Sequence, residues 1–174
     1  MRRPLAALSL AALAVLAPSL PAMAQDEPQK VLESNTFGLN ISAINAKVAQ
    51  GDAAAAAGNL AKAKVDYDQA RLGAQNLTRF YRNLSGSFRG LDARIPREMD
   101  QKGREALELQ ATIDLRLAAL LRRMNQPEVA VPLLVEVVQI MTPASPLGQK
   151  AYQTLLELGF VSTPYAGSAA TPGS

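Results

Sequence analysis

Apolar residues recur every three or four positions over most of the chain after residue 40. This is the period of an α-helix that buries one face. The first pattern consists of Ile41, Ile44 and Val48. We expect Gly51 to interrupt this first helix, which continues as an alanine run of high helix propensity from Asp52 to Ala57. Gly58 and Asn59 then form a stop and a turn.

The longest pattern runs from Leu60 to Leu84 and corresponds to roughly 37 Å of helix. Small residues fill its first half, whereas leucine and tyrosine fill its second half. A partner helix is therefore expected to cross closely over the first half. The apolar positions of this pattern are Leu60, Ala63, Tyr67, Ala70, Ala74, Leu77, Tyr81 and Leu84.

A connector is predicted from Ser85 to Pro96, because this stretch holds two glycines and ends in a proline. Pro96 suits the first position of a helix, which then runs to about Met124. Within this helix, Glu98 with Lys102 and Asp100 with Arg104 have the spacing of i,i+4 ion pairs. We expect Phe88 and Ile95 in the connector to pack back onto the helices while Arg89 and Arg94 point outward.

Two shorter helices complete the pattern. Pro127 begins a helix to about Met141, although the valines of residues 129–138 make a strand the competing interpretation. The flanking helices and the proline start favour a buried helix. Ser145 is a predicted N-cap, and the last helix ends at Leu158 with Gly159 as its C-cap.

The first 24 residues have the organisation of an export signal. Arg2 and Arg3 precede an apolar run from Leu5 to Ala17, and Ala22-Met23-Ala24 is a small-x-small cleavage site. The run is too short to span a membrane, which takes about 20 apolar residues. We therefore predict an exported chain that is cleaved after Ala24 and has no transmembrane segment.

The rest of the chain divides into three parts. Residues 25–39 are polar and are predicted to be flexible, residues 40–160 to form one helical domain, and residues 161–174, rich in Pro, Gly, Ser, Ala and Thr, to be disordered. Without Arg2 and Arg3, the 18 basic residues become 16 against 15 acidic ones, a net charge of +1.

The composition excludes several chemistries. The chain has no Cys and no His, so it has no disulfide, no thiol or histidine nucleophilic site and no zinc or copper site of the usual ligands.

The acidic residues offer no paired carboxylates for catalysis. Asp66 and Asp68, two positions apart, point to different sides of a helix. Glu105 and Glu108 lie near Lys102 and Arg104 and are expected to form surface salt bridges. We therefore expect no enzyme, no metal and no cofactor.

Two turns resemble those of tetratricopeptide repeats. They lie 67 residues apart, near twice the repeat unit of about 34 residues. The first frame is Gly51, Gly58, Asn59, Leu60, Ala63, Tyr67 and Ala70, and the second is Leu117, Ala118, Leu121, Asn125, Ala130, Leu134 and Val137. The middle turn of a regular array would fall near Asp92, where the signature residues are missing.

The resemblance implies an all-α fold of antiparallel helical hairpins, a tetratricopeptide-like array of about five helices. An ordinary helical bundle is the alternative. It also implies a protein–protein interaction or scaffold module rather than an enzyme. The wider sequence resembles exported helical proteins of photosynthetic bacteria, whose compartments are the periplasm and the thylakoid lumen, so a subunit of a membrane complex is a candidate partner.

Two groups of arginines are candidate partner-binding residues. Between Arg79 and Arg104 the chain has a local charge of +4, and Arg89, Arg94 and Arg97 are expected to form an outward ridge for an acidic partner or an anionic surface. Nucleic acid is not expected, because no stacking or groove motif accompanies these charges. A structural accessory subunit that docks by this basic rim is the alternative function.

The second group follows from the resemblance, in which the first helix of each hairpin lines a concave groove. Arg122 and Arg123 would face that groove and grip a carboxylate, unless they serve only to oppose the helix dipole. The residues assigned to the groove are Asn45, Val48, Asp52, Thr112, Leu115, Ala119, Arg122 and Arg123.

Overall fold

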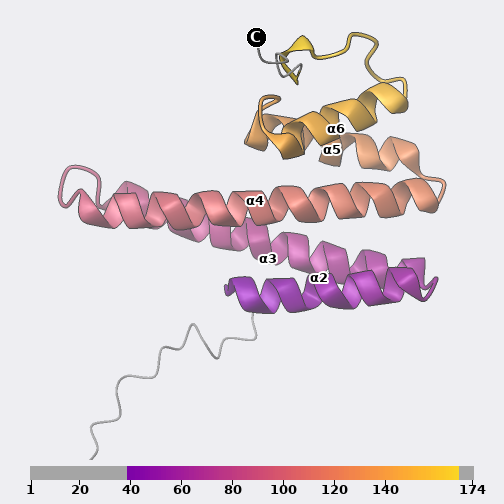
Figure 1. The fold of residues 1–174 in the computed structure, drawn as a ribbon. Helices are drawn as coiled ribbons and strands as arrows, with labels where there is room; N and C mark the ends of the chain where they lie inside the picture. Colours follow the sequence, from indigo (N-terminus) through magenta and orange to yellow (C-terminus); the bar gives the residue numbers. More distant parts are fainter. Residues whose placement is uncertain (1–38, 169–174) are drawn as a thin grey trace, which may run out of the picture.

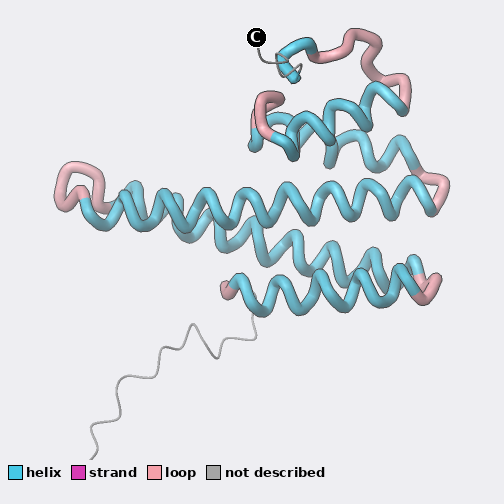
Figure 2. Tube along the Cα trace, viewed as in Figure 1, coloured by secondary structure: helices cyan, strands magenta, loops and turns pink. Residues whose placement is uncertain are grey.

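The computed structural model describes residues 39–168, and these form an all-α fold (Figure 1). No strand occurs in this range, so the competing interpretation of residues 129–138 as a strand is wrong (Figure 2). The predicted signal peptide, residues 25–38 and residues 169–174 lie outside the described residues. The helices are α2 (Ile41–Ala56), α3 (Leu60–Ser87), α4 (Arg94–Arg123), α5 (Pro127–Met141), α6 (Pro146–Glu157) and the short 3-10 helix η1 (Ala166–Ser168).

Each α-helix packs against the next one along the chain, and short turns make consecutive helices antiparallel (Figure 1). Helix α4 also contacts α2 and α6 directly. Helices α3 and α4, with 28 and 30 residues, are the longest, and their connected ends project beyond the other helices. This arrangement fits a helical array or bundle. It has two distinct surfaces, one along α2, α4 and α6 and one at the projecting end.

Three helices end with the same cap. Gly58, Asn125 and Gly159 have positive φ angles of 78°, 59° and 78°. In each case the following residue donates its backbone N–H to a carbonyl five residues earlier, as Asn59 does to Ala54. Asn125 therefore has the same backbone conformation at the end of its helix as Gly58 and Gly159 have at the ends of theirs.

Gly51 does not interrupt the first helix, contrary to the sequence-based prediction. Helix α2 continues through it, because the glycine serves a close helix crossing rather than a turn. A Cβ at Gly51 would lie 2.6 Å from Cε1 of Tyr67 on α3. The absence of a side chain thus makes room for the Tyr67 ring.

The connector between the two long helices is shorter than predicted. Helix α3 continues to Ser87, and α4 begins at Arg94, so Pro96 is the third helical residue rather than the first. Proline is tolerated in the first turn, whose N–H groups lack helical partners. The hydroxyl of Ser85 donates to Oδ1 of Asp100 at 2.6 Å, which helps to keep the two helices paired up to the turn.

Part of the predicted disordered tail is in contact with the helical domain. Val161 packs against the core, and the hydroxyl of Tyr152 donates to the carbonyl oxygen of Thr163 at 2.7 Å. Val161 and Thr163 of this segment therefore contact the helical domain.

The core is built from small side chains where the helices cross. Ala63 and Ala70 of α3 are 0% and 1% exposed. We expect Ala63→Leu and Ala70→Leu each to lower the free energy of unfolding by about 1–3 kcal/mol, because the added methylenes have no free volume between the helices. Thermal or urea unfolding of each variant tests this, and wild-type stability in both would contradict the close crossing.

Candidate functional site

The first candidate surface is the inner face, by which we mean the side formed by α2, α4 and α6. It contains a hollow of about 360 Å³ between α4 and α6. Four residues assigned to the groove from sequence, Thr112, Leu115, Ala119 and Arg122, line this hollow together. The other residues that line it are Arg116, Ala118, Leu134, Leu147, Lys150 and Thr154.

The remaining groove residues from the sequence lie elsewhere. Val48 is 7% exposed and belongs to the core, so its assignment to the groove is wrong. Asn45 is exposed on α2 but lines neither hollow of the inner face. Arg123 lines a smaller hollow of about 160 Å³ next to Tyr67, and its guanidinium donates to the carbonyl oxygen of Ala55 at 3.2 Å.

The side chain of Asp52 on α2 contacts side chains of α3 and α4 at the inner face. It accepts a hydrogen bond of 2.6 Å from the hydroxyl of Tyr67 on α3 and forms an ion pair with Arg116 on α4. Burial raises the pKa of Asp52, but the Tyr67 hydroxyl and the Arg116 guanidinium outweigh it and hold that pKa below 3.8. Burial and the same carboxylate raise the pKa of Tyr67 to about 12. At neutral pH, Asp52 is therefore ionised and Tyr67 protonated.

The positive charges of the hollow remain accessible. Arg122 contacts Glu157 at 3.3 Å, but both side chains are exposed, and an exposed pair of this kind contributes little free energy. Lys150 is exposed and has no ion pair within residues 39–168. Two cations over an apolar floor of Leu115, Leu134 and Leu147 suit a ligand that has carboxylates on an extended backbone.

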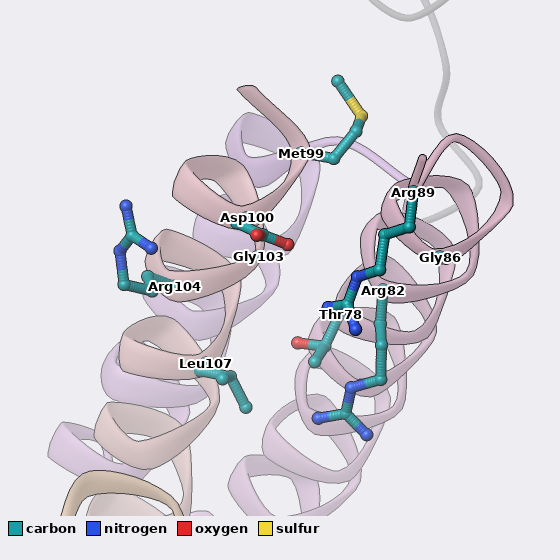
Figure 3. Close-up of a pocket in the computed structure, with 9 residues that line it drawn as sticks. All are labelled: Thr78, Arg82, Gly86, Arg89, Met99, Asp100, Gly103, Arg104 and Leu107. Atoms are coloured by element: carbon teal, nitrogen blue, oxygen red, sulfur yellow. The ribbon is translucent and has the colours of Figure 1, made fainter. Parts of the chain in front are cut away.

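The second candidate surface is the hairpin end, by which we mean residues 79–104 at the projecting end of α3 and α4. A hollow of about 520 Å³ lies between the two helices at this end (Figure 3). Arg82 of α3 and Arg89 of the loop after α3 extend toward it, and Arg104 borders it on α4. Its other lining residues are Thr78, Gly86, Met99, Asp100, Gly103 and Leu107.

The structure brings only part of the predicted arginine ridge together. Arg89 lines the hollow, but Arg94 forms an ion pair of 2.7 Å with Asp92 and Arg97 lies outside the hollow. Sequence reasoning missed Arg82 and Arg104 as lining residues. Arg82 precedes Arg89 by seven residues, about two helical turns, and this spacing was the available signal, although α3 ends at Ser87 before Arg89 is reached.

The predicted orientations in the connector agree with the structure at most positions. Ile95 packs against the core, and Phe88 is half-buried. Arg89 and Arg94 are both exposed. Leu91, in contrast, is 80% exposed at the outermost turn.

The acidic residues form structural pairs. Asp66 accepts from Lys62 at 2.6 Å and Asp68 from Lys64 at 2.7 Å, on different sides of α3. Glu98 pairs with Lys102 as predicted. The other predicted pairs do not form.

Asp100 accepts from Ser85 rather than Arg104. Glu105 and Glu108 have no salt bridge within the described range, because Lys102 turns to Glu98. Within residues 39–168, no group of acidic side chains is placed to hold a metal ion.

A partly buried ionic cluster joins α3, α4 and α5, and no sequence pattern predicted it. Arg71 Nε donates to Asp114 Oδ1 at 2.6 Å, and the same guanidinium pairs with Glu136. Gln110 donates to the other oxygen of Glu136 at 2.7 Å. Asp114 is 0% exposed, its Oδ2 accepts no hydrogen bond, and burial raises its pKa to about 6 despite Arg71.

Comparison with models of known families, with curated proteins and with solved structures finds no match. None of the helices between residues 39 and 168 is long and apolar enough to cross a membrane. The functional argument therefore depends on the two surfaces themselves.

Proposed function

We propose that the protein is an exported interaction module, with a tetratricopeptide-like helical frame, that binds an acidic segment of a protein partner along its inner face. A role in assembling a membrane complex, in the periplasm or the thylakoid lumen, fits the predicted export signal. One observation carries the proposal: four residues that the helical frame assigns to a groove, Arg122 among them, line one hollow together with Lys150.

The chemistry of the hollow favours a peptide over a small substrate. Its polar groups are two hydroxyls, from Thr112 and Thr154, and cationic side chains, with no paired carboxylates for acid–base work. Arginine binds a carboxylate through two parallel hydrogen bonds, and leucines beside it accept an apolar neighbour in the same segment. This combination supports recognition of an acidic peptide that alternates with apolar residues.

A second candidate function is a structural accessory subunit that docks by its basic rim onto a membrane complex or an anionic surface. The observation that favours it is the set of arginines around the hollow of the hairpin end, Arg82, Arg89 and Arg104. The two candidates place the binding surface at different parts of the molecule.

Charge reversal separates the two surfaces. We expect Arg122→Glu with Lys150→Glu to weaken capture of a partner from native membrane and soluble extracts by at least about tenfold, or about 1.4 kcal/mol. The matched control, Arg97→Glu with Arg104→Glu, makes the same change of charge at the hairpin end and is expected to retain that partner. Quantitative mass spectrometry of the captured proteins measures both.

Two results would contradict the proposal. One is equal capture of the same partner by the inner-face variant and the unaltered chain. The other is loss of that partner only in the control variant, which would favour the accessory-subunit candidate instead.

A further inference from the structure

The hairpin end presents exposed apolar side chains, one of them in its outermost turn. Leu91 is 80% exposed in the loop of residues 88–93, and Phe80 is 45% exposed on the last part of α3. The loop lies beyond the ends of α2, α5 and α6, so these helices do not cover it (Figure 1). A leucine held out in water at the tip of a projecting turn gains free energy when it enters an apolar phase.

Arginines without acidic partners are spread along the hairpin end. Within the part of the chain that the structure describes, neither a hydrogen bond nor an ion pair joins them to an acid. The neighbouring cations Arg94 and Lys102, in contrast, are neutralised by Asp92 and Glu98. The unpaired set is Arg79, Arg82, Arg89, Arg97 and Arg104.

We propose that the hairpin end binds the surface of a membrane that contains anionic phospholipids. Leu91 lies at the boundary of the hydrocarbon, while Arg82 and Arg89 contact lipid phosphates. The inference deepens the second candidate function, docking by the basic rim, by naming the surface that this rim binds. It does not rest on the function proposed for the inner face, which lies on a different surface.

The separation of Arg82 and Arg89 along the axis of α3 agrees with the thickness of a lipid headgroup layer. Arg89 is in the tip loop, and Arg82 lies six residues before Phe88, or roughly 9 Å along the helix axis. The polar layer on each side of a bilayer is about 5–8 Å thick. An arginine side chain reaches across the small difference, so both guanidinium groups meet phosphates when Leu91 reaches the hydrocarbon boundary.

The hollow behind the tip provides space for a headgroup. It measures about 520 Å³ and is open toward solvent, with Arg82 and Arg89 directed into it (Figure 3). Asp100 is the acid that lines it, and its Oδ1 is already engaged by Ser85. A phosphate that enters the hollow therefore meets the guanidinium groups of Arg82 on α3 and Arg89 in the tip loop, whereas Arg104 on α4 points away from it (Figure 3).

The distribution of apolar residues favours a membrane over a protein partner. Leu91 and Phe80 are separated from each other by charged positions instead of forming one contiguous patch. A protein interface needs a shaped apolar centre with a polar rim, whereas a bilayer accepts isolated apolar side chains wherever basic residues hold the phosphates. One leucine with several arginines gives weak and reversible attachment.

Vesicle sedimentation tests the proposal with the chain that begins at Gln25, which is the chain that the predicted cleavage after Ala24 leaves. We expect binding to vesicles of phosphatidylglycerol, weakened by added salt, and no binding to vesicles of phosphatidylcholine. Arg82→Gln with Arg89→Gln is expected to weaken binding at least about tenfold, since each arginine near an anionic surface contributes about fivefold. Leu91→Gln is expected to weaken binding severalfold, with circular dichroism melts unchanged in all variants.

A matched control removes the same charge from the opposite end of α4. Arg122→Gln with Arg123→Gln is expected to bind phosphatidylglycerol vesicles as the unaltered chain does. Equal loss in this control would show attraction by net charge alone and would overturn the assignment to the hairpin end. Equal binding to both lipids, or to neither, would also overturn it.

Two further measurements distinguish other sources of the same chemistry. Free glycerol phosphate, at the concentration of the lipid phosphate, is expected not to displace the vesicles; displacement would assign the hollow to a soluble phosphate instead. Retention of an acidic protein that is lost in Arg82→Gln with Arg89→Gln, combined with no vesicle binding, would assign the hairpin end to a protein partner.

Discussion

Replacing Arg71 with Met is expected to lower the free energy of unfolding by about 3 kcal/mol at pH 7. Arg71 is the cation between Asp114 and Glu136, and Asp114 is completely buried. Without Arg71, the Asp114 carboxylate has no counter-charge in the core and must either stay ionised at high cost or take up a proton. We use the lower end of the usual range because the side chains of Arg71 and Glu136 are 25% and 30% exposed.

A double replacement distinguishes a lost ion pair from lost packing. Arg71→Met combined with Asp114→Leu removes the charge and its partner together, and buried ion pairs exchanged for apolar residues are often tolerated. We expect the double variant to regain most of the stability that the single variant loses in urea unfolding. If the two losses add instead, the cluster contributes through packing and not through charge.

The two ends of α5 and the start of α6 were predictable because each is marked by a local chemical signal, whereas Pro96 marked the start of α4 only to within two residues. Helix α5 begins at Pro127 and ends at Met141 as predicted, because a proline at its first position and a turn after it mark both ends. Ser145 caps α6 by accepting the N–H of Gly148, also as predicted. Where the signal was ambiguous, packing decided: Gly51 continues α2 because it faces Tyr67.

The candidate sites were predictable only along single helices. Thr112, Leu115, Ala119 and Arg122 share a face of α4, so helical periodicity alone places them together. Lys150 was missed because its position depends on how α6 crosses α4, which no local pattern records.

The partly buried ionic cluster was missed for the same reason. Arg71 and Asp114 lie 43 residues apart in the middle of two long helices. Nothing near either residue marks it as a partner of the other, because each is flanked by residues of an ordinary helix interior. Charged residues at mid-helix positions that break an apolar seam deserve inspection for such pairs, since a lone buried charge is costly.

The stability of the protein is expected to fall as the pH rises from 4.5 to 7.5, by about 2 kcal/mol. The folded-state pKa of Asp114 is raised to about 6 from 3.8, because burial disfavours its ionised form. A raised pKa means that the folded chain binds the proton more tightly than the unfolded chain does. Its contribution to stability is therefore present below about pH 4 and lost as the pH passes 6.

Two other kinds of titrating group do not change the stability between pH 4.5 and 7.5. The chain has no His, which is the side chain that ordinarily titrates between pH 5 and 8. Asp52, whose pKa is lowered, loses its contribution only as the pH falls below 3.8. Urea unfolding of the Asp114→Asn variant, which cannot titrate at this position, is expected to give nearly the same free energy at pH 4.5 and 7.5.

The Arg71→Met variant independently checks the direction in which stability changes with pH. At pH 4.5 the carboxyl of Asp114 is protonated in the folded chain, so removal of Arg71 leaves no buried charge there and costs less than at pH 7.5. We expect the loss in this variant to shrink as the pH falls. A loss that stays constant across the range, or an unaltered chain that is more stable at pH 7.5 than at 4.5, would show that Asp114 remains ionised in the core.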